Sequence, residues 1–411
     1  MSPAERRVGM SLAAIFALRM LGLFLILPVF AVHARSIPGG DDAVLVGLAL
    51  GAYGLTQACL QIAFGAASDR YGRKPVILFG LALFVLGSVV AALAADIYMV
   101  IAGRVLQGAG AISAAVTALA ADLTREQHRT KVMAMIGSSI GLMFALSMVA
   151  APLLYDAIGM SGIFWFITAL AVGAMALVVW VVPSAPGEQM MPRDRRGAIK
   201  HILFHGPLMR LNFGVFVLHL IQMMMWVTLP TVLDTLLGSS AGAITGRPPT
   251  AEHWKVYLPA VLLSFVAMVP AVIAAERSGR FKLVFSGAVA LFALVQLGRL
   301  YAWTGGVWLV GVWLTFFFVA FNILEAMQPS LISRIVQPAV KGMALGVYNT
   351  LQSVGIFIGG AAGGWLVRHY GQTGVSWCCC VLALLWLAMT VTLQAPSSRR
   401  ESSGAPPEPR N

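Results

Sequence analysis

Charged side chains interrupt long apolar stretches of the sequence at Arg19, Arg104 and Glu325. An ionised group at the centre of a membrane is unfavourable by roughly 2.5–3.5 kcal/mol on insertion scales, so it is expected to face a partner, a cavity or a ligand. Arg19 can bind an anionic group or hold a counter-carboxylate, and Arg104 can instead be a structural donor to backbone carbonyls. Glu325 is the best internal acid, and Asn322 lies three residues earlier on the same helix face.

Polar side chains also recur at helical spacing after residue 43. Tyr53, Gln57 and Gln61 are four residues apart and share one face of a helix. In a membrane protein such a face usually turns inward. It can line a substrate path or hydrogen-bond to a neighbouring helix, and the sequence leaves both possibilities open.

The composition determines which elements must position these residues. The chain has 411 residues, of which 59% are hydrophobic and 11% charged, whereas soluble domains carry about 25% charged residues. A membrane-spanning helix needs ~20 apolar residues. We therefore predict an all-α membrane protein with twelve transmembrane helices. The expected spans are residues 8–33, 43–67, 75–95, 98–121, 131–155, 162–182, 211–236, 255–275, 282–301, 306–328, 341–367 and 375–394.

The basic residues predict an orientation for these spans. With the N-terminus in the cytoplasm, 21 of the 28 Lys and Arg residues fall in cytoplasmic segments, four in outer loops and three within spans. This asymmetry is the positive-inside pattern of membrane proteins. It explains the net charge of +12 through topology and contact with anionic membrane lipids, without nucleic acid. Both termini are expected in the cytoplasm.

Three other ionisable residues carry weaker signals. His219 titrates near neutrality, but a packing role is the simpler interpretation. Asp234 and Arg299 lie near the outer ends of their expected spans, where an interfacial position accounts for them.

The two halves of the chain repeat each other. The loop at 69–74 matches the loop at 276–282 at an offset of 207, and residues 131–134 match 341–344 at an offset of 210. We therefore predict two six-helix repeats around a central site. The expected domains are residues 1–183, a cytoplasmic linker at 184–210, residues 211–395 and a disordered cytoplasmic tail at 396–411. Five glycines, at 355, 359, 360, 363 and 364, give the span at 341–367 a small-residue packing face.

The strongest motif runs from Gly65 to Pro75 and resembles the signature between helices two and three of the major facilitator superfamily. The resemblance implies a conformational latch that joins the two halves when a transporter faces outward, with Asp122 as the partner of Arg73. The alternative is a simple topological anchor. The expected latch residues in the first half are Gly65, Asp69, Arg70, Gly72, Arg73 and Asp122, and those in the second half are Glu276, Arg277, Gly279 and Arg280.

A second motif, Arg104 to Ala111 with Gln107 inside it, resembles the buried-arginine motif of the same superfamily, which is linked to proton coupling in antiporters. Segments along almost the whole chain resemble the YajR-type members, among them Leu18–Gly22 and Ala251–Leu258. Those members are proton-driven, drug-efflux-like transporters of the inner membrane. They carry a small soluble C-terminal domain, which this chain is expected to lack.

The sequence thus predicts a proton-coupled exporter of small amphipathic molecules that works by alternating access. A monomer is expected, with a small-molecule substrate and protons as its partners. The proton and substrate path is assigned to Arg19, Tyr53, Gln57, Arg104, Gln107, Asn322 and Glu325. A uniporter or importer of the same fold, or a non-transporting membrane sensor or scaffold, remains an alternative. No enzyme, cofactor or metal site is predicted, because the sequence shows no nucleophile–base constellation, phosphate loop or metal-ligand cluster.

Overall fold

Long helices make up the described part of the protein. The computed structural model describes the chain except for residues 184–205, 241–248, 279, 337–340 and 392–411. The expected tail and most of the expected linker therefore lie outside the described residues, and the described ones contain no β-strand. The elements are α1 (Pro3–Phe24), α2 (Phe30–His33), η1 (Ala34–Ser36), α3 (Ala43–Tyr71), α4 (Arg73–Ala92), α5 (Ile97–Ala109), α6 (Ser113–Asp122), α7 (Glu126–Trp180), α9 (Gly206–Ser240), η2 (Pro249–Glu252), α11 (Trp254–Ser278), α12 (Phe281–Ala302), α13 (Gly306–Ile335) and α14 (Lys341–Val391).

The number of membrane spans agrees with the sequence prediction. Ten helical segments in the described part of the chain are long and apolar enough to cross a membrane. Two of them, in α7 and α14, are 50 and 48 residues long. Each bends at a glycine with positive φ, at Gly159 (66°) and Gly371 (61°), and so contains two of the expected spans. The predicted fold class, an all-α membrane protein, is confirmed.

Two expected spans are interrupted, however. The span at 8–33 divides into α1 and α2, and Pro28, which has no amide hydrogen to donate, lies between them. The span at 98–121 divides into α5 and α6, because Gly110 leaves the helical conformation with φ −74° and ψ 52°. A break of this kind leaves backbone groups without helical partners. The second break positions polar groups beside Arg19.

Glycines on two faces of α14 hold its first half between α3 and α9. A Cβ atom built on Gly360 would lie 2.4 Å from the carbonyl oxygen of Gly47 on α3, and one on Gly359 would lie 2.3 Å from the carbonyl oxygen of Leu220 on α9. Such distances require glycine, because a methyl group would collide with backbone. The glycines thus form two packing faces, one against α3 and one against α9, where the sequence predicted one.

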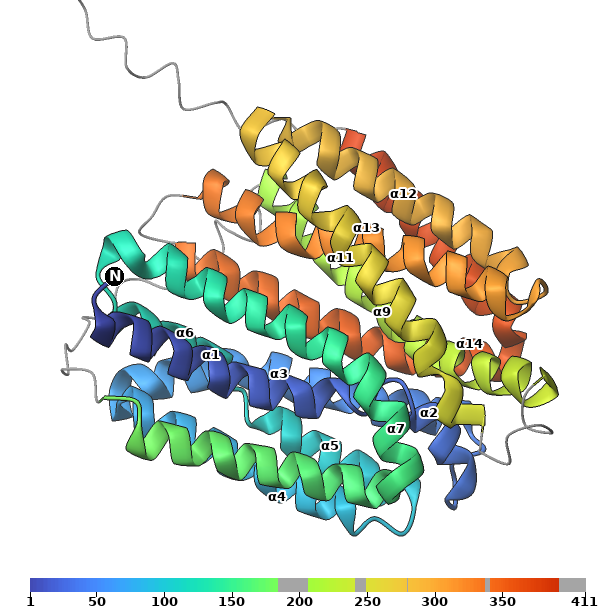
Figure 1. Ribbon diagram of the computed structural model, residues 1–411, viewed down its shortest axis with the longest axis horizontal. Helices are drawn as coiled ribbons and strands as arrows, with labels where there is room; N and C mark the ends of the chain where they lie inside the picture. Colours follow the sequence, from blue (N-terminus) through green and yellow to red (C-terminus); the bar gives the residue numbers. More distant parts are fainter. Residues whose placement is uncertain (184–205, 241–248, 279, 337–340, 392–411) are drawn as a thin grey trace, which may run out of the picture.

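The N-terminal half (α1–α7) and the C-terminal half (α9–α14) lie side by side (Figure 1). A chain of aromatic rings crosses between them. Phe24 on α1 contacts Phe144 on α7 with ring centroids 5.2 Å apart. Phe144 contacts Phe318 on α13 at 5.5 Å, and Phe318 lies 6.5 Å from Trp226 on α9. Phe144, Phe318 and Trp226 belong to one buried hydrophobic cluster that includes both halves, and Phe24 packs against it.

Candidate functional site

Arg19 is buried, with 1% of its surface exposed, beside the break between α5 and α6. Its guanidinium donates to the carbonyl oxygen of Gly110 at 3.1 Å and to the Ser113 hydroxyl at 3.2 Å. It also donates to the Tyr53 hydroxyl at 2.5 Å and to Oε1 of Gln57 at 3.4 Å. Arg19 therefore satisfies backbone and side-chain acceptors at the break, and its positive charge faces neutral oxygens in this arrangement.

Arg104 is equally buried but has different partners. It donates to the carbonyl oxygens of Ala49 and Leu50 on α3, at 3.3 and 3.5 Å, and to Oε1 of Gln107 at 2.8 Å. Its guanidinium also lies 5.1 Å from the centroid of the Tyr53 ring. These contacts match the structural interpretation of Arg104, in which the arginine ties α5 to α3.

The polar face of α3 reaches across to the other half of the molecule. Tyr53 and Gln57 both contact Arg19, and Nε2 of Gln57 donates to the Ser353 hydroxyl on α14 at 3.2 Å. Gln61, on the same face, is buried. The sequence left open whether this face lines a path or bonds to a neighbour. In the structure, Gln57 bonds to residues of both halves.

Glu325 belongs to a second polar cluster, in the C-terminal half. Its carboxylate lies 3.5 Å from Nε2 of His219 on α9 and accepts a hydrogen bond of 3.4 Å from Gln352 on α14. The amide of Gln352 is also 2.7 Å from the same histidine nitrogen. The Glu325 side chain is 36% exposed, whereas that of His219 is 4% exposed. His219, expected to be a packing residue, is thus the ionisable neighbour of the internal acid.

Asn322 does not join this cluster. It is buried, and its amide donates to the Ser264 hydroxyl on α11 at 2.9 Å. Apart from Asn322, the expected path residues therefore separate into three groups. Arg19, Tyr53 and Gln57 form the first, Arg104 with Gln107 the second, and Glu325 the third.

Sequence reasoning underestimated Arg299. It was expected at the interface, but no part of its surface is exposed. Its guanidinium donates to the Thr228 hydroxyl at 2.6 Å and lies 5.3 Å from the centroid of the Trp303 ring. The signal that could have revealed this site is the aromatic residue four positions later, because residues i and i+4 meet on a helix surface.

Asp234 accepts a hydrogen bond of 2.8 Å from Thr250.

Several latch residues predicted in the first half contact one another within the N-terminal half. Arg73 donates to Asp122 at 2.9 Å and to the Ser68 hydroxyl at 2.9 Å, and it also pairs with Asp69. Gly72 has a φ of 94°, a conformation that glycine adopts without strain. The pairing of Arg73 with Asp122 has the geometry that the motif implies.

The remaining latch residues are described only in part. A Cβ atom on Gly65 would lie 3.6 Å from Cβ of Ala114, and Arg70 lies over the ring of Tyr71 at 5.3 Å. Arg277 and Arg280 are exposed. Gly279 and the side chain of Glu276 lie outside the described residues.

Comparison with protein families identifies the chain. The family model of the Major Facilitator Superfamily matches residues 12–248 and again residues 248–411. The chain belongs to the major facilitator superfamily. Members of this superfamily are membrane transporters and not enzymes, so the chain is a multi-pass membrane transport protein that handles small molecules.

Individual relatives fit this membership. The chain is 44% identical over 399 residues to the inner membrane transport protein YajR of Escherichia coli, covering 96% of this chain and 85% of that protein. It is 31% identical over 189 residues to the multidrug resistance protein MdtL of Escherichia fergusonii, covering 41% of this chain and 48% of MdtL. The expected resemblance to YajR is confirmed along nearly the whole chain.

Solved structures of the superfamily share the fold. A D-xylose–proton symporter superposes with a TM-score of 0.73 over 94% of this chain and 98% of its own, at 15% sequence identity. The human organic anion transporter MFSD10 superposes with a TM-score of 0.68 over 95% of this chain and 100% of its own, at 16% identity. At such identities the likeness concerns the fold alone.

Proposed function

We propose that this chain is a proton-coupled exporter of small amphipathic molecules, with Glu325 as the residue that carries the coupling proton. Protons would move inward through the protein while substrate moves outward. The membership of the superfamily and the similarity to YajR and to part of MdtL support this proposal.

One observation carries the proposal. Glu325 accepts a hydrogen bond from Gln352 of α14. Gln57, which contacts Arg19, donates to Ser353, the next residue of the same helix. A change in the charge of Glu325 therefore acts on the helix that also holds the contact between α14 and α3. This arrangement gives a physical route from protonation to the contact between the two halves.

The chemistry of the step follows from the partners of Glu325. When ionised, its carboxylate accepts the hydrogen bond of Gln352 and lies 3.5 Å from Nε2 of His219. A proton taken up by Glu325 removes that negative charge and turns one oxygen into a donor. The hydrogen bonds among Glu325, His219 and Gln352 must then rearrange. We place the exposed part of the Glu325 side chain on the path by which the coupling proton arrives.

The remaining parts of the proposal concern the whole transporter. We place it in the cell (inner) membrane, with both termini in the cytoplasm, in contact with anionic lipids and as a monomer that binds no nucleic acid. The halves at 1–183 and 211–395 act as two bodies that alternate around a central site, with the linker at 184–210 between them. The loops at 65–73 and 276–280 act as the latch on the cytoplasmic side.

The proposal is tested with purified protein in proteoliposomes that contain a pH-sensitive dye. Ethidium, rhodamine 6G and fluorescein serve as amphipathic probes of different charge. Wild-type protein is expected to move at least one probe against its gradient when a pH gradient is imposed, and to dissipate that gradient. Glu325→Gln is expected to lose gradient-driven transport by more than ten-fold and to retain probe exchange at equilibrium.

The alternatives give different results in the same assay. A uniporter or importer would move the probe down its gradient with no change in the dye signal, in wild type and in Glu325→Gln alike. A sensor or scaffold would move no probe. Asn322→Asp, which adds a carboxylate three residues away, is a matched control for nonspecific charge effects. Restoration of coupling by Asn322→Asp in the Glu325→Gln background would contradict the specific role of Glu325.

A further inference from the structure

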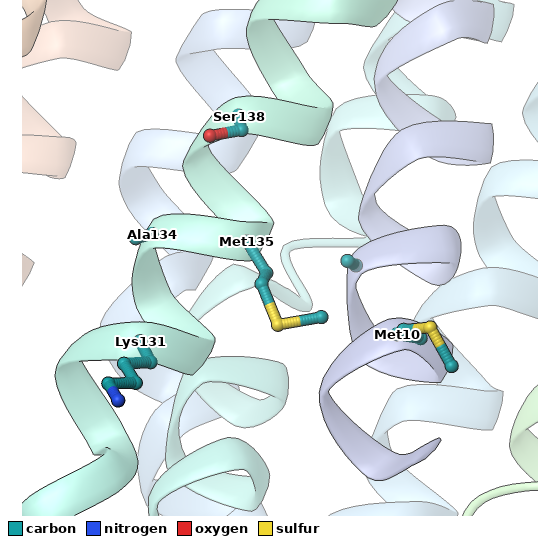
Figure 2. A pocket seen from close by; sticks show the side chains of 6 residues that line it. Met10, Lys131, Ala134, Met135 and Ser138 are labelled. Carbon is teal, nitrogen blue, oxygen red and sulfur yellow. The ribbon is translucent and has the colours of Figure 1, made fainter. Parts of the chain in front are cut away.

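A pocket opens between α1 and α7 (Figure 2), near the end of the molecule where both helices begin (Figure 1). Its volume is about 580 Å³, and it is lined by Met10, Ala13, Lys131, Ala134, Met135 and Ser138. Figure 2 shows Met135 extending from α7 towards α1, with Lys131 at one end of the α7 wall and Ser138 at the other. The pocket is therefore a shallow, open apolar groove with a cation at one end.

Lys131 is the charged group of this groove. It is exposed, and none of the ion pairs between described side chains involves it. Arg6 and Arg7 on α1 are also exposed and lie one turn before Met10. An anionic group at this end of the groove would therefore meet a lysine that has no carboxylate partner among the described residues.

The depth of the groove matches a lipid molecule. The apolar segment of α7 begins at Lys131, and Ser138 is seven residues further along, about 10 Å at the rise of an α-helix. Lys131 thus lies where lipid headgroups lie, and the apolar wall lies at the depth of the first part of an acyl chain. With the orientation that the basic residues favour, this is the cytoplasmic leaflet, which carries anionic lipid.

We propose that this groove binds an anionic phospholipid, with the phosphate on Lys131 and an acyl chain between α1 and α7. Methionine suits such a wall, because its unbranched thioether adapts to a flexible chain. The lysine supplies the preference for an anionic headgroup. The proposal rests on the orientation of the protein and does not depend on proton coupling or on the transported substrate.

A second groove provides an internal contrast. It lies between α3 and α4, has a volume of about 370 Å³, and is lined by Leu60, Ala63, Phe64, Ala67, Tyr71, Pro75, Val76 and Phe79. No charged residue lines it. A lipid chain in that groove would show no preference for an anionic headgroup, so the two grooves can be distinguished by headgroup selectivity.

The test uses native mass spectrometry of the purified full-length protein. The protein is taken from detergent mixed with equal amounts of phosphatidylglycerol and phosphatidylcholine that carry the same acyl chains. Wild type is expected to retain phosphatidylglycerol with a roughly five-fold preference, the factor for one lysine at a charged membrane surface. Lys131→Ala is expected to bring the preference close to one, and Lys131→Arg to keep it.

Matched variants identify the site. Lys282→Ala removes an exposed lysine at the start of α12, and it should leave the preference unchanged. Ala134→Trp fills the groove and should abolish the preference, whereas Ala63→Trp in the second groove should leave it. An unchanged preference in both Lys131→Ala and Ala134→Trp overturns the proposal. If inorganic phosphate stabilised the protein as much as phosphatidylglycerol does, the proposal would also be overturned, because a free anion would then suffice.

Discussion

Buried arginines in this protein are held by neutral oxygens and aromatic rings. Arg19 bonds to the carbonyl of Gly110 and to hydroxyl and amide oxygens, Arg104 to two carbonyls and Gln107, and Arg299 to Thr228. Several oriented dipoles can stabilise a buried cation in place of a carboxylate counter-ion. The arrangement also fixes helix positions, because each arginine bonds to a helix other than its own: Arg19 and Arg104 to α3, and Arg299 to α9. At the residue scale, the positive charges therefore act first as structural ties.

The structural role of Arg104 leads to a prediction that separates it from Glu325. In Arg104→Lys, a point charge with three donors replaces the planar guanidinium and cannot reach both carbonyls of α3 and Gln107 together. Thermal stability is expected to fall, with a loss of roughly 1–3 kcal/mol for unsatisfied buried groups. The number of protons exchanged per substrate is expected to remain that of wild type.

The measurements for Arg104→Lys are a thermal unfolding curve and proton flux from the dye signal in proteoliposomes. Gln107→Glu is a useful companion. It gives Arg104 a charged acceptor and keeps the Arg104 donors to the α3 carbonyls, while it removes the amide that Gln107 donates to Ser88. If Arg104→Lys kept full stability and lost proton coupling, the structural interpretation would be wrong and the motif's link to proton coupling would apply here.

Sequence reasoning at this scale could find the buried charges but not their partners. The depth of Arg19 and Glu325 follows from counting residues in an apolar run. The contact of Arg19 with Gly110 depends on the break between α5 and α6. The sequence does not predict this break, because membrane helices tolerate glycine without breaking. His219 and Glu325 meet because α9 and α13 have particular rotations about their axes. Spacing within one helix cannot give the rotation of two helices relative to each other.

At the element scale, α14 is the helix on which the two halves meet. Gly360 and Gly364 approach α3, and Gly355 and Gly359 approach α9. A helix with glycine on one face can pack closely against one neighbour, but α14 does so against two neighbours in opposite halves. The sequence predicted the small-residue face of this span. It could not predict the second contact, because five glycines within ten residues cover more than one face of a helix.

Gly360→Ala should therefore separate α14 from α3. The new methyl group would lie 2.4 Å from the carbonyl oxygen of Gly47 and 3.0 Å from Cα of Gly51, and backbone cannot yield as a side chain can. Overpacking of this kind is unfavourable by roughly 1–3 kcal/mol. We expect the population with α3 and α14 in contact to fall by about five-fold or more.

Spin labels at Asp41 and His369, two exposed positions beside the same end of this contact, report the separation by pulsed electron resonance. The expected result for Gly360→Ala is a longer distance in a larger fraction of molecules. Gly346→Ala is the matched control on the same helix, since no atom lies within 4 Å of its new methyl group. A distance distribution identical to wild type in Gly360→Ala would show that the contact tolerates a methyl group.

At the scale of the whole molecule, contacts between the halves follow the α3–α14 seam from the middle to one end. Gln57 bonds to Ser353 near the middle, Gly47 and Gly360 meet further along, and Asp42 pairs with Arg368 at 2.8 Å at the end. With the proposed orientation, the Asp42 end faces outward. The described seam therefore closes the outer side, and an alternating transporter must open it to reach the outward-facing state.

The ion pair itself contributes little to this closure. Arg368 is 57% exposed and Asp42 32% exposed, and exposed ion pairs are worth about 0–1 kcal/mol. Asp42→Asn is therefore expected to change transport by no more than about five-fold. The pair is more informative as a position at which the two halves can be joined covalently.

Cross-linking at these positions should stop transport. A variant with Asp42→Cys and Arg368→Cys, in a background with Cys59→Ala and Cys378→Ala, would be treated with a short bifunctional thiol reagent that reducing agent can cleave. We expect probe transport in proteoliposomes to fall by at least ten-fold after cross-linking and to return after reduction. Each single cysteine variant, treated in the same way, is expected to transport normally, because reagent on one half leaves the seam free to open. Full transport by cross-linked protein would mean that substrate passes without separation of α3 and α14 at the Asp42 end, and the two halves would then have to move about a different contact.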